Sequence, residues 1–346
     1  MHTIVVTGGC GYIGSHTALA LLEKGYEVLS IDVLEHNQTQ VEADICTLSG
    51  KAFQNTRINL CNLRALRRFF AERKNIAGII HFAAHKLVPE SMQRPLRYYG
   101  NNLLSLINVL VCAREHNIKA FIYSSSSAVY GNVNSLPVTE ETPCFEQQSV
   151  YGRTKYFGEH IVRDAVPIAS LRAVILRYFN PAGAHESGLL GEYDQGPPQN
   201  LVPALTAAAA GIIPELVVFG KDYPTPDGTC IRDYVHVMDI AEAHVKALEY
   251  VLNQGDGPSV EVVNLGSGTG YSVLQMIEAF ENTTGLKVPY RIGPRRSGDA
   301  VAVYADHSKA TRLLGWQPRR PLSEIMLSAW RRRQLLVERA VSKSAG

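Results

Sequence analysis

The chain lacks a long hydrophobic run and carries little net charge, and these absences exclude several classes of protein. No stretch of 18 or more apolar residues occurs, so no transmembrane helix is predicted. The first seven residues, MHTIVVT, resemble the start of a β-strand and contain no cationic segment or signal core. A net charge of +2 gives no basic surface for nucleic acid or an acidic membrane. We therefore expect a cytoplasmic protein that binds neither.

Cysteine is scarce and shows no pattern. The six cysteines are Cys10, Cys46, Cys61, Cys112, Cys144 and Cys230. They form no Cys-x-x-Cys pair and do not alternate with histidines, so we expect reduced thiols and neither a disulfide framework nor a metal site. With 346 residues, of which 46% are hydrophobic, the chain can form one large domain or two moderate ones.

Short apolar segments alternate with segments of helical period through the first 180 residues. The pattern predicts strands at 3–7, 27–31, 57–60, 77–82, 120–124 and 173–178, and helices at 14–24, 63–74, 103–116 and 150–162. This alternation is typical of an α/β fold with a doubly wound parallel sheet, the Rossmann fold. Such sheets bind ligands outside the carboxyl ends of their strands.

The pattern changes after residue 180. The segments "PAGAHESGLLGEYDQGPPQN" and "YPTPDGT" are rich in glycine and proline and predict loops. The alternation returns with a strand at 233–237, a helix at 239–252 and a strand at 261–265. We expect a Rossmann domain of residues 1–180 plus 233–269, and a smaller discontinuous α/β domain of 181–232 plus 270–346 that closes over the ligand crevice. The last residues, "WRRRQLLVERAVSKSAG", predict a solvated helix that frays into a tail.

The segment "TGGCGYIGS" directly follows the first predicted strand. Its glycines permit a tight turn and a close approach to a pyrophosphate, and the following helix offers free N–H groups to that anion. Asp32 ends the second strand, 18 residues after Gly14. An acid there accepts hydrogen bonds from a ribose 2′-hydroxyl and repels a 2′-phosphate. The combination favours NAD over NADP, whereas a structural turn beside a solvated aspartate is the alternative.

Tyr151 and Lys155 lie four residues apart in a predicted helix and share a face. A free phenol titrates near pH 10. A neighbouring ammonium and the positive field of a nicotinamide ring both favour the phenolate, so we expect them to lower the pKa of Tyr151 and make it a base near neutral pH. The fifth strand ends in "YSSSSAVYG", whose hydroxyls can bond the same substrate oxygen. Tyr-x-x-x-Lys is also a common surface spacing, but its combination with the glycine loop favours function.

These three features together resemble the extended short-chain dehydrogenase/reductase superfamily. The segments "HFAAHKLVPES", "PLRYYGNN", "LRYFNPAGAH", "DYPTPDGTCIRDYVHVMDIAEAH", "NLGSG" and "PRRSGD" resemble the UDP-glucose (UDP-galactose) 4-epimerase family almost end to end, most weakly over 33–62. Asn59, Ala84 and Gly100 depart from the family, which usually has aspartate, glycine and aspartate there. The resemblance implies a homodimer formed through helices 103–116 and 150–162.

The resemblance also implies a reaction. Tyr151 removes the proton of the sugar 4-hydroxyl while a hydride passes from C4 to NAD, and the 4-keto sugar then receives the hydride on its other face. Ser126 bridges Tyr151 and the sugar oxygen, while Lys155 holds the nicotinamide ribose and tunes the phenol. The residues implied to bind the cofactor are Gly8, Gly11, Tyr12, Ile13, Gly14, Asp32, Asn59, Leu60, Phe82, Ala83, Ala84, Lys86, Asn101, Ser124, Tyr151, Lys155 and Phe179.

Contacts with the UDP-sugar are implied for a second set of residues. They are Ser126, Tyr151, Asn180, Asn200, Leu201, Val217, Phe219, Arg232, Arg296, Asp299 and Val303. The arginines suit this role because guanidinium groups bind phosphate oxygens in a fixed fork. Some members of the family carry a bulky tyrosine at the position of Val303, and a small residue there is associated with room for a 2-acetamido group. We therefore expect the N-acetylated sugar pair to be accepted as well.

Three alternatives remain. A nucleotide-sugar 4,6-dehydratase needs an Asp-Glu pair as its acid and base, and this chain has Ser127 and Ala128 at those positions. A net oxidoreductase would accumulate reduced cofactor, which an epimerase does not. A non-catalytic NAD sensor of this fold can dispense with the tyrosine base, whereas this chain keeps Tyr151, Lys155 and Ser126 together.

Overall fold

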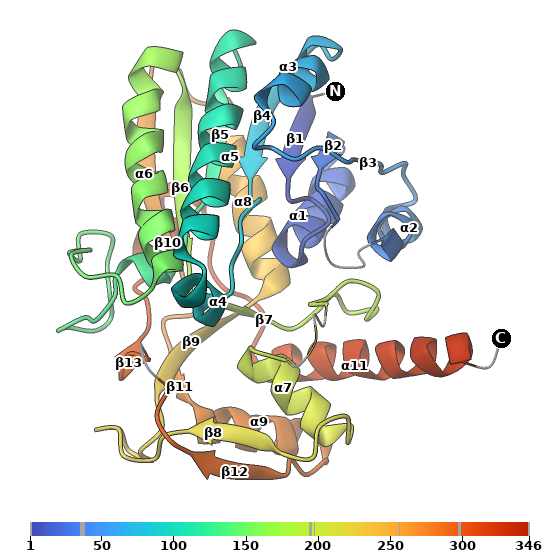
Figure 1. Ribbon diagram of the computed structural model, residues 1–346, viewed down its shortest axis with the longest axis vertical. Helices are drawn as coiled ribbons and strands as arrows, with labels where there is room; N and C mark the ends of the chain where they lie inside the picture. The colour runs from blue at the N-terminus through green and yellow to red at the C-terminus, as the bar shows by residue number, and fades with distance from the viewer. Residues whose placement is uncertain are drawn as a thin grey trace.

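A large parallel sheet forms the centre of the upper part of the molecule (Figure 1). The computed structural model describes residues 2–34, 39–193, 196, 198–255, 257–296 and 299–344. The strand order is β10-β6-β5-β4-β1-β2-β3. The strands are β1 (Thr3–Thr7), β2 (Glu27–Ile31), β3 (Asn55–Thr56), β4 (Ile76–His81), β5 (Ala120–Ser124), β6 (Arg172–Tyr178) and β10 (Ser259–Leu265). The order reverses between β1 and β4, which confirms the doubly wound fold and places the ligand crevice at that edge.

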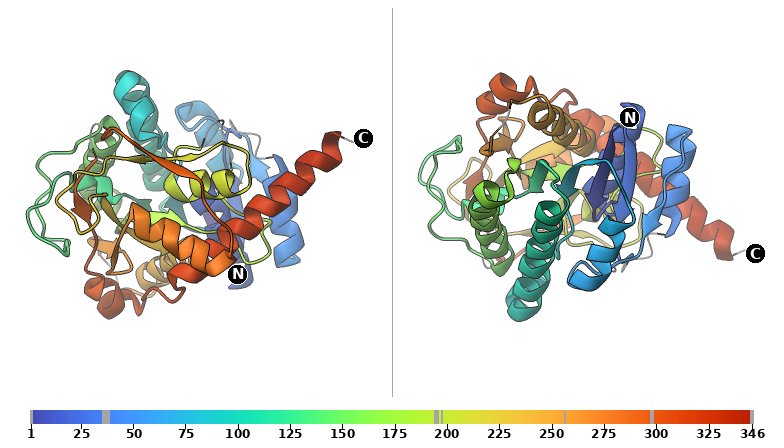
Figure 2. Two further views of the ribbon diagram at one scale, coloured as in Figure 1. Left: turned by 90° about the horizontal axis from the view of Figure 1, so that it is seen from below. Right: turned by 90° about the horizontal axis from the view of Figure 1, so that it is seen from above.

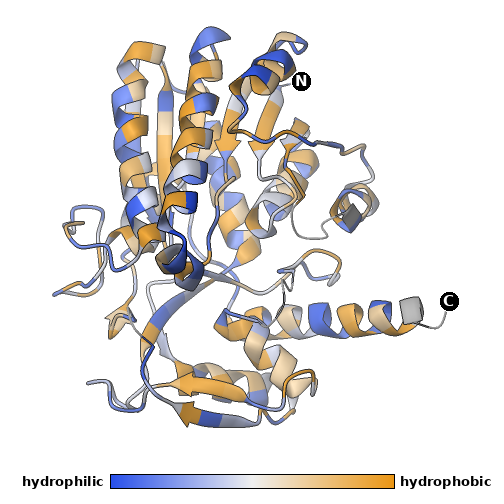
Figure 3. Ribbon diagram, in the orientation of Figure 1, coloured by the Kyte–Doolittle hydropathy of each residue, from blue (hydrophilic) through white to orange (hydrophobic). Residues whose placement is uncertain are grey.

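Helices cover both faces of this sheet because side chains alternate along each strand. Ile4 and Val6 point into a core with α1 (Tyr12–Glu23), α2 (Thr39–Ser49), α8 (Val237–Leu252) and α10 (Ser308–Leu314). Val5 points into the opposite core with α3 (Leu63–Ala71), α5 (Pro95–Glu115) and α6 (Val150–Ala169). Figure 3 shows the resulting alternation of hydrophobic and hydrophilic bands along α6. The short helix α4 (Val88–Gln93) precedes α5.

The lower part of the molecule is a smaller α/β assembly (Figure 1). Strand β9 (Ile231–His236) pairs with β7 (Asn180–Ala182), β11 (Gly270–Ser272) and β13 (Ala302–Val303), and β8 (Leu216–Phe219) pairs with β12 (Tyr290–Gly293). The helices α7 (Leu201–Ala209), α9 (Val273–Thr284) and α11 (Leu322–Ser344) pack a separate core. No helix in the described part of the chain is both long and apolar enough to cross a membrane.

Some element boundaries differ from those predicted. The strand predicted at 57–60 is wrong, because the edge strand β3 ends at Thr56. Its Asn55 accepts a hydrogen bond from the Ser30 hydroxyl and donates one to the Asp32 carbonyl, which fixes the pairing earlier in the chain. The strand predicted at 233–237 forms as β9 but belongs to the smaller sheet.

The C-terminal helix connects the two parts of the molecule. It is helical to Ser344, and the last two residues of the predicted tail lie outside the described part of the chain. The prediction of a solvated helix is wrong at Arg332 and Arg333, which are buried. Arg339 forms a two-pronged hydrogen-bonded ion pair with the buried Asp44 of α2, at 3.0 and 3.2 Å. In Figure 2 the C-terminal end of α11 extends outward beyond α2.

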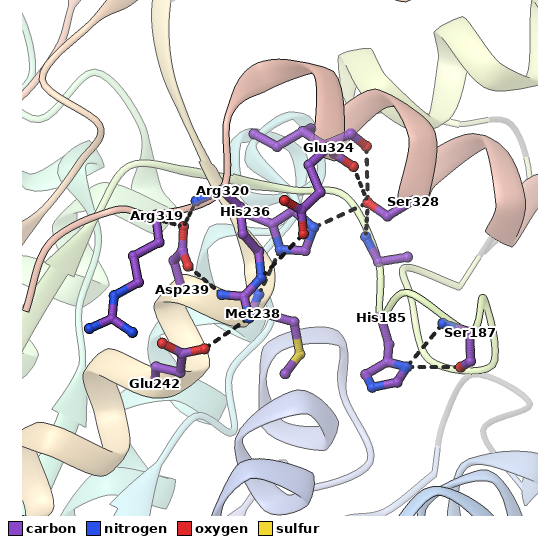
Figure 4. A network of polar contacts seen from close by, with 12 residues as sticks. His185, Ser187, His236, Met238, Asp239, Glu242, Arg319, Arg320, Glu324 and Ser328 are labelled. Carbon is purple, nitrogen blue, oxygen red and sulfur yellow. Dashed lines mark hydrogen bonds and ion pairs between the residues drawn. The ribbon is translucent and has the colours of Figure 1, made fainter. Parts of the chain in front are cut away.

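A polar network joins the beginning of α8 to the chain around α11 (Figure 4). The Asp239 carboxylate accepts backbone N–H groups of Arg319 and Arg320 at 3.0 Å each and pairs with the Arg320 guanidinium. His236 Nδ1 accepts the Met238 N–H, so its Nε2 donates to Ser328 Oγ at 3.1 Å. Burial lowers the pKa of His236 to about 3, which keeps this bridge neutral.

Candidate active site

The glycine loop lies directly after β1 and is shaped by close backbone contacts. Gly8 has a φ of +71°, and a Cβ at Gly14 would lie 2.1 Å from the Gly8 carbonyl oxygen. Gly11 caps α1 without a side-chain hydrogen bond, and the first turn of α1 contains no acidic residue. This helix start therefore offers backbone N–H groups to an anion, which fits the pyrophosphate of NAD.

Asp32 lies beside this loop at the end of β2. Its Oδ2 accepts the Cys10 N–H at 3.2 Å and its Oδ1 accepts the Leu34 N–H at 3.1 Å. Burial and the nearby Asp32 raise the pKa of Cys10 to about 12, so the thiol stays protonated. The partly buried carboxylate suits a ribose hydroxyl next to the pyrophosphate position.

Tyr151 and Lys155 lie on the first turns of α6. The Ser149 hydroxyl accepts the Gly152 N–H at 3.0 Å and caps the helix just before the tyrosine. Lys155 Nζ donates to the Ser124 carbonyl at 2.6 Å and lies 5.9 Å from the centroid of the Tyr151 ring. Both side chains are at least nine-tenths buried. The structure therefore brings the predicted base and its predicted cation together at the end of β5.

The pKa of Tyr151 differs from the expectation. It lies well above the ordinary value because burial disfavours the phenolate, and the nearby Tyr178 acts in the same direction. A hydrogen bond with Ser126 acts in the opposite direction. The prediction that the pKa is lowered is wrong for the chain without its cofactor, since desolvation outweighs the hydrogen bond with Ser126. The chain by itself holds Tyr151 as a neutral phenol.

The aromatic groups around Lys155 are neutral. Burial lowers the pKa of His81 to about 3 and that of His244 to about 4, and it raises those of Tyr123 and Tyr178. Burial also lowers the pKa of Lys155 itself to about 8. Lys155 is thus charged at neutral pH among uncharged rings, and the Glu159 carboxylate raises its pKa against the effect of burial.

Lys86 and Asn200 meet at Glu192, a residue that the sequence did not point to. Glu192 Oε1 accepts Lys86 Nζ at 2.9 Å and Asn200 Nδ2 at 2.8 Å. Lys86 Nζ also lies 5.7 Å from the centroid of the Tyr12 ring. One predicted cofactor contact and one predicted substrate contact therefore share a single carboxylate beside the start of α1.

Two arginines gather at the smaller sheet with an aspartate. Arg232 Nη2 lies 3.5 Å from Asp299 Oδ1, and Arg296 Nε lies 3.3 Å from Asp299 Oδ2. The Arg296 guanidinium stacks 5.2 Å from the centroid of the Phe219 ring. Val303 pairs with Arg232 across β13 and β9. Two cations against one carboxylate leave a positive charge that suits a diphosphate.

The other predicted residues occupy the same edge of the large sheet or the strands below it. Phe82 packs on His244 with ring centroids 4.5 Å apart, and Ser124 Oγ lies 3.3 Å from His244 Nε2. Asn59 accepts the Cys61 N–H, and Asn101 bonds Asn102. The remaining positions are Ile13 on α1, Leu60 before α3, Ala83 and Ala84 after β4, Phe179 after β6, Asn180 on β7, Leu201 on α7 and Val217 on β8.

Comparison with known proteins gives consistent relatives. A family model described as GDP-mannose 4,6 dehydratase matches residues 5–328. A UDP-glucose 4-epimerase of Schizosaccharomyces pombe is 45% identical over 337 residues, covering 96% of this chain and 94% of that protein. A UDP-glucose 4-epimerase of Bacillus subtilis is 44% identical over 329 residues, covering 95% and 96%.

Solved structures agree with these relatives. The UDP-glucose 4-epimerase of Stenotrophomonas maltophila, solved with bound NAD and formylated UDP-arabinopyranose, superposes with a TM-score of 0.94 at 40% identity, covering 98% of this chain and 100% of that one. The enzyme of Bifidobacterium longum, solved with NAD+ and UDP, gives 0.91 at 44% identity, covering 96% and 98%.

Proposed function

The chain belongs to the UDP-glucose 4-epimerase family of the extended short-chain dehydrogenase/reductases, and from this membership we propose how its residues carry the reaction. It is an NAD-dependent isomerase that interconverts UDP-galactose and UDP-glucose. The proposal rests on one observation above all. Tyr151, Ser126 and Lys155 lie together at the end of β5, at the same carboxyl edge of the large sheet as the glycine loop.

Tyr151 exchanges a proton with the sugar 4-hydroxyl. The glycine loop and Asp32 would hold NAD, which would supply the acceptor and donor for the hydride of C4. Ser126 holds the sugar oxygen next to the phenol, while the Lys155 ammonium and the cofactor's positive ring favour the phenolate against the effect of burial. Buried Tyr151 is shielded from water, so the proton passes between the phenol and the sugar oxygen.

Epimerisation fits the site better than dehydration, although the matching family model bears a dehydratase description. Water loss needs a carboxyl acid and base next to the sugar. Ser127 and Ala128 occupy the positions where dehydratases carry this pair, and they form the short helix η1 (Ser127–Val129) directly after Ser126. This chain therefore lacks the proton shuttle for elimination at that place.

The N-acetylated sugar pair is proposed as a second substrate. Val303 lies on β13, opposite the substrate arginine Arg232, and its side chain is small compared with a tyrosine. Val303→Tyr is expected to abolish turnover of UDP-N-acetylgalactosamine while UDP-galactose is still converted. Failure of the unaltered protein to convert the acetylated sugar would refute this extension.

A homodimer through α5 and α6 is also proposed. Leu104 and Ile107 are 43% and 41% exposed on α5, and Phe157 is 43% exposed on α6. Leu104 and Ile107 are one turn apart and share a face. Leu104→Lys together with Ile107→Lys is expected to give monomers in sedimentation velocity, and an unchanged mass would contradict the proposal. The Ile212→Lys variant, on the smaller part of the molecule, is the matched control.

We propose that the protein is cytoplasmic. We also propose that its two domains are divided at residues 180, 232 and 269. All six cysteines are free thiols, which suits a reducing compartment. In this division the Rossmann domain binds NAD and the smaller domain binds the nucleotide sugar. Residues 180 and 232 lie within β7 and β9, so limited proteolysis with and without UDP tests the boundary at residue 269, where cleavage should fall when UDP closes the crevice.

The decisive experiment incubates the purified protein with UDP-galactose and UDP-N-acetylgalactosamine separately. NMR should identify the 4-epimer of each sugar without net reduction of NAD. A keto product or accumulating reduced cofactor would instead indicate a dehydratase or a net oxidoreductase. Binding of NAD without turnover of any nucleotide sugar would favour a sensor.

A further inference from the structure

A buried carboxylate follows Lys155 by one helical turn without pairing with it. Glu159 is only 2% exposed on α6, and residues four apart on a helix commonly form ion pairs. Here Arg177 of β6 takes the Glu159 carboxylate with two bonds, Nε to Oε1 at 2.9 Å and Nη2 to Oε2 at 2.6 Å. Lys155 and Glu159 both belong to the described residues, and no ion pair joins them; the lysine bonds the Ser124 carbonyl instead.

The same carboxylate fixes the serine run. The Ser125 hydroxyl, fully buried, donates to Glu159 Oε1 at 2.6 Å. On one side of Ser125, the Ser124 carbonyl accepts Lys155 Nζ. On the other side, Ser126 bonds Tyr151. A single carboxylate therefore holds the segment that orients both the lysine and the catalytic hydroxyl.

Arg177 is anchored at its far end. Its Nη1 bonds the Tyr130 hydroxyl at 3.1 Å, and that hydroxyl donates to Asn264 Oδ1 at 2.6 Å. Arg177 as a whole is 5% exposed, so its guanidinium is rigidly placed and its charge is shielded little by solvent. Glu159 thus has a fixed counter-ion on a neighbouring strand.

The remaining groups that face the ammonium come from every neighbouring element. They are Tyr151 on α6, Tyr123 on β5, His81 on β4 and His244 on α8. Tyr178 on β6 bonds Tyr151 beside them. All are neutral at pH 7, as described above. Glu159 forms no ion pair with Lys155, although its charge raises the pKa of the lysine against the larger effect of burial. Because Arg177 holds that carboxylate, the lysine's charge can act on the phenol.

We propose that Arg177, Glu159 and Ser125 are positioning residues for the proton transfer: Arg177 withholds the Glu159 carboxylate from Lys155, and the carboxylate holds the Ser124–Ser126 segment in place. The inference rests on the proposed role of Tyr151 as the base. It predicts that the charge balance around Glu159 sets how easily Tyr151 loses its proton.

The test compares a single variant with a double variant. Arg177→Met frees Glu159 to pair with Lys155, so the pKa of Tyr151 should rise. As a result kcat should fall about 10- to 100-fold with little change in KM. This loss is part of the rate gain that a positioned base supplies. Adding Glu159→Gln removes the freed charge, and kcat should recover about tenfold in the double variant. Arg177→Lys keeps a cation beside Glu159 and should retain more activity than Arg177→Met.

The titration of Tyr151 provides a readout independent of turnover. Phenolate formation is followed by ultraviolet difference spectroscopy against the Tyr151→Phe variant in each background. The inference is supported if the pKa of Tyr151 is raised in Arg177→Met and returns to the value of the unaltered protein in the double variant. Equal losses of activity in both variants, with an unchanged pKa of Tyr151, would overturn the inference. The proposed epimerase reaction would not be affected by that result.

Arg177→Met leaves a buried carboxylate and can fail to fold. The double variant then carries the test, because it keeps the shape of the pair without its charges. Its Tyr151 should titrate near the value of the unaltered protein; a titration raised by a full pH unit refutes charge withholding. Turnover by Tyr151→Phe itself would refute the role of the base, which is a different failure.

Discussion

Four buried histidines should make the protein labile in mild acid. His16, His81, His236 and His244 are each at most 2% exposed. Burial lowers their pKa values to about 4, 3, 3 and 4. Unfolded histidine titrates near 6.5. Between these values the unfolded chain binds more protons than the folded one, so the free energy of unfolding decreases as pH falls below 6.5.

The size of this effect follows from the pKa values. At pH 5 an unfolded histidine has gained about 2 kcal/mol from protonation while its buried counterpart remains neutral. Four such residues give about 8 kcal/mol, which is comparable with the whole stability of a typical domain, about 5–15 kcal/mol. The protein is therefore expected to unfold near pH 5, above the range in which its carboxylates titrate.

Urea unfolding monitored by circular dichroism from pH 7.5 to pH 5 measures this directly. Around pH 5.5 the slope should correspond to an uptake of nearly four protons on unfolding. His244→Gln should remove about one proton from that uptake, whereas Ile212→Gln, at an exposed position without a titratable group, should leave it unchanged. An uptake below one proton, or equal effects of the two variants, would refute the reasoning.

Three further substitutions test the site. Gly14→Ala should abolish retention of NAD, measured from the absorbance of the purified protein, because its Cβ would meet the Gly8 carbonyl; Gly100→Ala, where a Cβ meets open space, should retain it. Arg296→Ala should raise KM for UDP-galactose about tenfold or more at similar kcat, whereas Arg295→Ala, paired with an exposed Asp222, should change KM little. Tyr151→Phe should lower kcat by about 10²–10⁴ while NAD still binds; undiminished turnover would contradict the assigned base.

Much of the fold was predictable because its causes are local. Strands such as β1 and β5 are short, mostly apolar segments, and the helices between the strands have their own period. The glycine loop and Asp32 follow β1 and β2 in the sequence, so their place at the carboxyl edge comes from the strands alone. The resemblance supplied residues such as Arg232 and Asp299, and the structure brings these two together.

What could not be predicted depends on burial and on packing between distant elements. The pKa of Tyr151 rises because the core desolvates it, and no local pattern reveals that. Arg177 meets Glu159 only because α6 packs over β6, and Arg339 reaches Asp44 only because α11 crosses to α2. The strand predicted at 57–60 was misplaced because a two-residue edge strand gives too weak a pattern.

The most direct test of a hydride that leaves and returns to C4 uses UDP-galactose labelled with deuterium at that carbon. The purified protein in ordinary water should yield UDP-glucose that still carries deuterium at C4, detected by NMR, and no reduced cofactor should accumulate. Replacement of the deuterium by hydrogen from water, or inversion at any other carbon, would contradict the mechanism.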